Sequence, residues 1–178
     1  MKSISLLLLA ILTVALTACQ NESPPPEEPR IYWGTTWVEK NGIPWSPYPS
    51  VSLNTVLKNK LNFSFTELDK YGLKREKCSI TKAPTAPGTY PLNNTFIQTD
   101  DGLVGSHYFF NDDDFLLGYY DVLEADSSSF MTILSYDTVT REVKGTFEAT
   151  YIVKQRPYPG APDTIRLRNG VFHTKVLQ

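Results

Sequence analysis

Cysteine and histidine are scarce in this sequence, with two residues of each among 178. Neither His107 nor His173 has metal-ligating neighbours at a useful spacing, so we expect no zinc-type site. Basic residues are also slightly outnumbered, with 17 lysines and arginines against 19 aspartates and glutamates. This balance argues against a nucleic-acid-binding protein, whose surface needs basic stripes.

No apolar run is long enough to cross a membrane as a helix. Residues 4–18 are uncharged and mostly Leu, Ile, Val and Ala, but a transmembrane helix needs about 20 such residues. This length, with Lys2 before it, is typical of a secretory signal peptide. The run ends in Leu-Thr-Ala-Cys, which looks like a bacterial lipobox. We predict that residues 1–18 are a lipoprotein signal peptide and that Cys19 carries the lipid; a plain signal peptide with an unrelated cysteine is the alternative.

A proline-rich segment follows the predicted lipid-attachment site. Residues 20–29 contain four prolines and no large apolar side chain, a composition that favours an extended spacer and cannot form a core. We predict that residues 19–30 comprise the lipidated cysteine and a tether. The remaining residues, 31–178, are enough for one domain with its own core.

If Cys19 is acylated, Cys78 has no disulfide partner. Cys78 lies in a predicted strand, where a cysteine usually packs as a small hydrophobic residue. A reactive thiol is the alternative, but it needs basic support in a cleft, and Lys77 is the one basic side chain beside it.

Alternating apolar and polar residues predict an all-β domain. In residues 142–153, one face of a strand carries Val143, Phe147, Ala149 and Tyr151, and the other carries Glu142, Lys144, Thr146, Glu148 and Thr150. That pattern is typical of a strand with one buried and one solvated face. Similar short segments recur between turns along residues 31–178. We predict a single antiparallel β-sandwich or a calycin-like β-barrel.

Asn-Gly pairs predict two tight hairpin turns, at residues 41–42 and 169–170. The second turn would pair Leu167 with Phe172 in the core and place His173 beside Arg166 on the solvated face. Further hairpins are predicted around residues 71–72, 111–114 and 137–141. Residues 51–61 come nearest to a helical spacing of apolar side chains and are the candidate for a short helix.

Three motifs of the chain are distinctive: WVEKNGIPW at residues 37–45, APGTYPL at residues 86–92, and SYDTVTREVKGTFEATY followed by IRLRNGVFHTKV within residues 135–176. In these motifs the chain resembles small Bacteroidota outer-membrane lipoproteins built around a β-rich domain of unknown function. The resemblance implies a lipid-anchored protein of the outer membrane that faces the periplasm or the cell surface. It implies no activity, cofactor or catalytic residue.

Tryptophan is concentrated near the start of the β domain, at Trp33, Trp37 and Trp45. Exposed aromatic rings bind sugars and apolar ligands through their faces. We therefore predict these three residues as ligand-binding residues and expect Trp45 to be exposed in a loop. Packing of the indoles in the core is the alternative.

The other candidate clusters carry weak signals. Residues 111–114 (Asn-Asp-Asp-Asp) and 100–102 (Asp-Asp-Gly) lack the spacing and distal glutamate of an EF-hand and suit turns equally well. Residues 105–107 (Gly-Ser-His) lack the context of a nucleophile elbow. We predict no metal site, no cofactor and no catalytic residue.

These features together predict a non-enzymatic lipoprotein of the cell envelope whose β domain binds a ligand or glycan. The alternative is an accessory or structural subunit of an envelope protein assembly with no small-molecule ligand. An enzyme is the third hypothesis. The expected partners are the membrane, through the lipid on Cys19, then a glycan or apolar ligand, and an envelope protein, but not nucleic acid.

Replacing Cys19 by Ala should abolish incorporation of a fatty-acid analogue and release the protein from the membrane fraction. The reason is that acyl chains anchor a protein through their buried methylenes, each contributing about 0.8 kcal/mol. Metabolic labelling of the unmodified protein is the positive control. Equal labelling of the two proteins would contradict the lipobox assignment.

Overall fold

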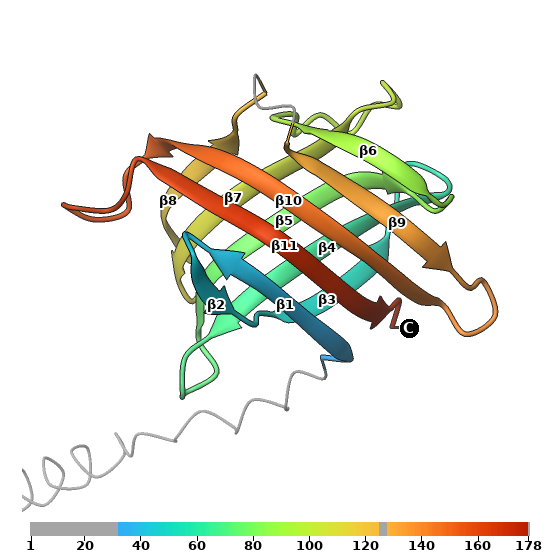
Figure 1. Ribbon diagram of the computed structural model, residues 1–178, viewed down its shortest axis with the longest axis horizontal. Helices are drawn as coiled ribbons and strands as arrows, with labels where there is room; N and C mark the ends of the chain where they lie inside the picture. The colour runs from blue at the N-terminus through green and yellow to red at the C-terminus, as the bar shows by residue number, and fades with distance from the viewer. Residues whose placement is uncertain (1–31, 125–127, 178) are drawn as a thin grey trace, which may run out of the picture. The chain divides into compact units, whose positions relative to one another are not determined.

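Eleven β-strands form the described part of the chain, residues 32–124 and 128–177, in the computed structural model (Figure 1). They are β1 (Gly34–Lys40), β2 (Ile43–Trp45), β3 (Tyr48–Leu53), β4 (Lys60–Leu68), β5 (Lys74–Pro84), β6 (Gly88–Asn93), β7 (Val104–Asp112), β8 (Phe115–Val122), β9 (Phe130–Tyr136), β10 (Glu142–Gln155) and β11 (Thr164–Lys175). The prediction of an all-β domain is confirmed. Cys19, the predicted signal peptide and the tether lie outside the described residues. Within those ranges no helix is long and apolar enough to cross a bilayer.

The strands belong to one sheet that rolls up around a core. Their order is β2-β1-β11-β10-β9-β6-β7-β5-β4-β3, and β8 pairs with both β10 and β7. The pairing of β6 with β7 is parallel, whereas the other strand pairs are antiparallel. Val51 of β3 forms a bridge with Val176, just beyond β11. β3, the last strand of this order, therefore lies against the chain at the end of β11, and this contact closes the rolled sheet (Figure 1).

Antiparallel pairing sorts the loops to two ends of the rolled sheet. Gly34 at the start of β1 lies opposite Thr174, and Lys40 at its end lies opposite Leu167. The end of the rolled sheet at which β1 finishes also carries the turns at residues 69–73, 113–114 and 156–163 (Figure 1). We call this end of the sheet the loop end. The first described residues, which precede β1, are therefore at the other end.

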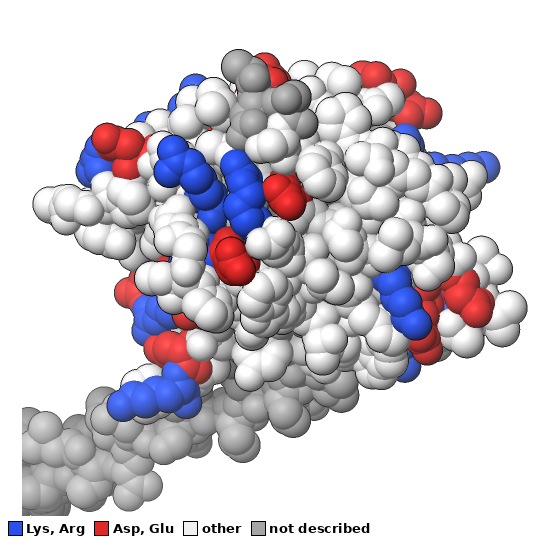
Figure 2. Space-filling model, viewed as in Figure 1, with Lys and Arg blue, Asp and Glu red and all other residues white. Residues whose placement is uncertain are grey.

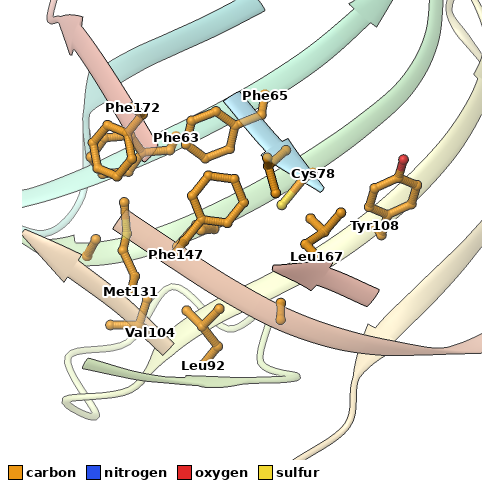
Figure 3. Packing of buried hydrophobic residues seen from close by; sticks show 14 of the residues in the cluster. Phe63, Phe65, Cys78, Leu92, Val104, Tyr108, Met131, Phe147, Leu167 and Phe172 are labelled. Atoms are coloured by element: carbon orange, nitrogen blue, oxygen red, sulfur yellow. The ribbon is translucent and has the colours of Figure 1, made fainter. Parts of the chain in front are cut away.

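Aromatic side chains fill the interior (Figure 3). Phe63 and Phe65 of β4 pack against Phe147 of β10 and Phe172 of β11, with ring centroids 4.6–6.4 Å apart. Each of these rings is at most 1% exposed. Full burial of such a side chain contributes about 1.5–3 kcal/mol. Since these rings occupy the middle of the domain, a binding site is to be sought on the outer surface.

Cys78 lies inside this core, as the sequence predicted. Its thiol is 3.2 Å from the Tyr151 hydroxyl, which also lies 2.7 Å from the Ser106 hydroxyl. The three buried polar groups thus satisfy one another. This arrangement confirms Cys78 as a packed strand residue.

Four of the predicted hairpins are present. Residues 41–42 join β1 to β2, with φ angles of 52° and 79° that fit a type I′ turn. The turns around residues 71–72, 111–114 and 137–141 join paired antiparallel strands in the same way. The helix suggested for residues 51–61 is wrong, because β3 ends at Leu53 and β4 begins at Lys60, and the two strands pair.

The hairpin predicted at Asn169-Gly170 is also wrong, because β11 continues through this position. Asn169 has a φ of 56°, and the pairing with β10 shifts from Phe147 opposite Gly170 to Ala149 opposite Leu167. This is a β-bulge, which changes the inward–outward alternation by one residue just as a turn would. Leu167 and Phe172 therefore both face the core, although five positions separate them.

Pairing on both sides explains why the strand does not turn. β11 is hydrogen-bonded to β1 along one edge and to β10 along the other, and these long-range ladders outweigh the local preference for a turn. His173 consequently lies opposite Thr35 and Lys144 rather than beside Arg166. Its place on the outer face agrees with the prediction, but its predicted neighbour does not.

Replacing Phe172 by Ala should lower the free energy of unfolding by about 3–5 kcal/mol, because the cavity would open beside three other buried rings. Arg166→Ala, on the exposed face of the same strand, should change it by no more than about 0.5 kcal/mol. Chemical denaturation of both variants measures the difference. Equal effects would contradict the assignment of the two faces.

Candidate functional site

Trp45 is buried, contrary to the prediction that it is exposed in a loop. It is 6% exposed and forms the end of β2, where it pairs with Val38 of β1 and turns inward. Its indole N–H donates a hydrogen bond to Glu67 Oε2 at 2.9 Å. The prolines around Trp45 suggested a loop, but the hairpin carries this segment back along β1.

A polar cluster surrounds Trp45 at the loop end. The Lys40 ammonium lies 2.6 Å from Glu76 and 5.2 Å from the centre of the Trp45 ring. The Tyr108 hydroxyl donates to Glu76 as well. Burial raises the pKa of Tyr108, so the phenol stays protonated and remains a donor. The polar groups of Lys40, Trp45, Glu67, Glu76 and Tyr108 thus bind one another, and these side chains cover this end of the core.

Trp33 and Trp37 lie on the outer face of the sheet. The Trp33 ring meets His173 edge-on at 5.1 Å, and the Lys175 ammonium lies 4.8 Å from its centre. Trp37 is 43% exposed and lies opposite Val171 of β11, which is also exposed. Trp37 is thus the tryptophan that presents the most ring surface to solvent.

An open groove of about 310 Å³ reaches Val171, the cross-strand neighbour of Trp37. It is lined by Phe130, Thr146, Phe147, Glu148, Asn169, Gly170 and Val171, and we call it the outer-face groove. Asn169 and Gly170 of the bulge form part of its lining. A Cβ at Gly170 would lie 2.5 Å from the Phe147 carbonyl oxygen, so only glycine fits there.

The strand register extends this groove into a row across five strands. Trp37, Val171, Thr146, Thr132 and Thr89 are successive cross-strand neighbours on β1, β11, β10, β9 and β6. We call these residues the outer-face row. Neighbouring strands lie about 4.8 Å apart, so the row spans about 19 Å. The Thr89 and Thr132 hydroxyls are 2.9 Å apart.

Charged and uncharged side chains share this face. In the view of Figure 2, which looks onto β1, β11, β10 and β9, a group of basic and acidic side chains lies to the upper left of the centre, and uncharged side chains cover the area between it and a second charged group at the right. Glu148 lines the groove and lies 3.7 Å from the Arg168 guanidinium. The face thus offers an aromatic ring, hydroxyls, the Asn169 side-chain amide and a partly neutralised carboxylate.

The histidines occupy different environments. His173 is on the outer face, with its Nε2 2.9 Å from Glu142. His107 is 1% exposed and is the cross-strand neighbour of Ser79 and Asp121. Within residues 32–124 and 128–177, His107 Nε2 has no hydrogen-bond partner.

The acidic turns make ion pairs with nearby strands. Asp112 pairs with Arg75, and Asp114 lies 2.8 Å from Lys74. Asp101 lies 2.8 Å from the buried Lys82 ammonium. No group of three or more His, Cys, Asp and Glu side chains is arranged to hold a metal within residues 32–124 and 128–177.

Sequence reasoning found Trp37 but missed the residues around it. Alternation placed Thr146 and Glu148 on a solvated face, and that is where they lie. Their proximity to Trp37 depends on β1 and β10 both pairing with β11. The Asn-Gly pair predicts a turn at Asn169, whereas this residue lines the groove.

Comparison with protein-family models, curated proteins and solved structures finds no match to this chain. The geometry of the outer face therefore carries the functional argument.

The Cys78 thiol should resist modification in the folded protein. Burial raises its pKa to about 12, and the hydrogen bonds of Tyr151 and Ser106 offset this only in part, so very little reactive thiolate is present at pH 8. In a Cys19→Ala variant, Cys78 is the single thiol. A disulfide reagent at pH 8 should label it slowly in buffer and rapidly in denaturant; rapid labelling in buffer would contradict this environment.

Proposed function

We propose that this protein is a non-enzymatic lipoprotein of the cell envelope whose β domain binds a glycan on its outer face. The observation that carries the proposal is the exposed Trp37 ring, whose cross-strand neighbour Val171 lines the outer-face groove. The lipobox at Cys19 and the proline-rich tether support display of the domain from a membrane. Ten extended residues would hold the domain about 30 Å from the bilayer.

The chemistry of the face suits a sugar chain. The apolar face of a sugar ring stacks on an indole such as Trp37. Its hydroxyls can exchange hydrogen bonds with Thr146, with the Asn169 amide and with the Glu148 carboxylate. Because Glu148 in the groove is paired with Arg168, the charges beside the groove partly neutralise each other, and a neutral glycan loses less hydration there than a charged one would.

The outer-face row favours a chain over a single sugar. Its length of about 19 Å exceeds one ring, so several rings could lie side by side across the strands. The groove is open, and open sites bury less ligand surface than enclosed pockets. We expect dissociation constants between about 1 mM and 1 μM, or −4 to −8 kcal/mol.

Replacing Trp37 by Ala should weaken glycan binding at least tenfold, about 1.4 kcal/mol, without unfolding the domain. A glycan array identifies the ligand, and a fluorescence or calorimetric titration measures the affinity. Phe115→Ala is the matched control, because Phe115 is 78% exposed at the loop end. Glycan binding that is unchanged in Trp37→Ala would contradict the proposed site.

A specific observation also favours the second function, an accessory subunit of an envelope assembly. Tyr71, Phe115, Leu116, Leu117 and Tyr158 are all exposed, at 43–78%, in or beside the turns of the loop end. Apolar side chains gathered in this way are typical of protein interaction sites. The loop end lies away from the start of β1, so a partner could approach it while the tether holds the protein.

Replacing both Phe115 and Leu117 by Ser should remove crosslinks to an envelope protein in intact cells if the loop end is a docking surface. Both side chains are exposed, so stability should change by about 0.5 kcal/mol or less for each. Crosslinking followed by mass spectrometry is the measurement, with Trp37→Ala as the control. An unchanged crosslinking pattern would count against the accessory function.

A further inference from the structure

The connection between β6 and β7 lies as a strap on the outer surface, at residues 94–103. Phe96 stacks on His107 of β7, with ring centroids 3.4 Å apart and planes 16° apart. Gln98 accepts a hydrogen bond from Asn54 at 2.8 Å. Asp100 and Asp101 form ion pairs with Lys60 and Lys82. The strap therefore has polar attachments toward its C-terminal end, and near its start it is held by the Phe96 ring and by the hydrogen bond from the Asn94 backbone to Glu124.

The histidine beneath the strap has an unusual environment. His107 Nε2 is buried and has no hydrogen-bond partner, and neither has the buried Asp121 Oδ1 at 3.6 Å from it. The backbone of Asn94, the first residue of the strap, also raises the pKa of this ring. A buried polar atom without a partner destabilises the state that contains it. The closed strap therefore covers two unsatisfied polar atoms.

The charged groups around the ring are few. Asp121 on β8 faces His107, and Lys154 on β10 lies 3.6 Å from the other Asp121 oxygen. Lys77 on β5 lies over the neighbouring Phe109 ring at 4.9 Å. Glu124, after β8, accepts a hydrogen bond from the Asn94 backbone. Lys154 thus offsets the one carboxylate that would stabilise a positive His107.

We propose that His107 is a proton-operated latch, which keeps the strap closed while it is neutral and releases it on protonation. An imidazolium under Phe96 would be a buried charge that only partly pairs with Asp121, and exposure to water relieves that cost. Opening would also widen the neighbouring groove of about 220 Å³, because Asn94 and Asp121 line both sites. This inference is independent of the glycan proposal.

The direction of the pH effect follows from linkage. Burial lowers the pKa of His107 from its usual 6.5, more than Asp121 and the Asn94 backbone raise it. The closed strap therefore binds the proton more weakly than an open one. The free energy that favours the closed strap is therefore greatest above pH 6.5. It decreases as the pH falls from 6.5 through the pKa that His107 has in the closed state.

NMR titration of the two histidines of the full-length protein tests the latch. His107 should titrate below pH 6.5, and its ring resonances should lose the shift caused by Phe96 stacking as it protonates. Phe96→Ala should raise the pKa of His107. If proton binding weakens closure of the strap, a substitution that weakens closure must strengthen proton binding by the same free energy. Ile97→Ala is the matched control, because Ile97 is an exposed neighbour on the same strap. It should leave that pKa unchanged.

A second measurement separates release from simple titration. Hydrogen exchange at residues 94–99, corrected for intrinsic rates, should speed up between pH 7.5 and pH 5 in the natural protein but not in His107→Gln. The latch would be overturned if Phe96→Ala left the His107 pKa unchanged. It would also be overturned if acid sped up exchange equally in His107→Gln.

Discussion

The packing of four phenylalanines in the centre of the domain is the interaction on which the rest of the structure depends. Phe63 and Phe65 come from one side of the rolled sheet and Phe147 and Phe172 from the other. Their contacts hold together strands that are about a hundred residues apart in sequence. They also fill the space that a ligand-binding barrel would leave open, which moves the candidate site to the outer face.

The bulge at Asn169 and Gly170 connects this core to the candidate site. It lets Leu167 and Phe172 of one strand both reach the interior, despite their odd spacing. Asn169, Gly170 and Val171 also line the outer-face groove, and Val171 is the cross-strand neighbour of Trp37. One local irregularity therefore takes part both in the packing of the core and in the lining of the groove, and bulges are often found near functional sites.

Sequence reasoning succeeded where neighbouring residues decide the outcome. Alternation identified the faces of β10, and turn chemistry located the hairpin at residues 41–42. It failed at Trp45 and at Asn169, because strand pairing over long distances decides whether a residue turns inward and whether a strand continues through an Asn-Gly pair. The outer-face row was out of reach for the same reason, since its five residues come from strands whose order is a property of the whole fold.

The central claim is that this domain binds on its outer face because its interior is full. Mapping chemical-shift changes during titration with a glycan identified by array tests it most directly. The account predicts that the largest changes fall on Thr89, Thr132, Thr146 and Val171, while core residues such as Cys78 and Phe65 stay unchanged. Changes centred on the core residues, or on the loop end at Phe115 and Tyr158, would contradict it.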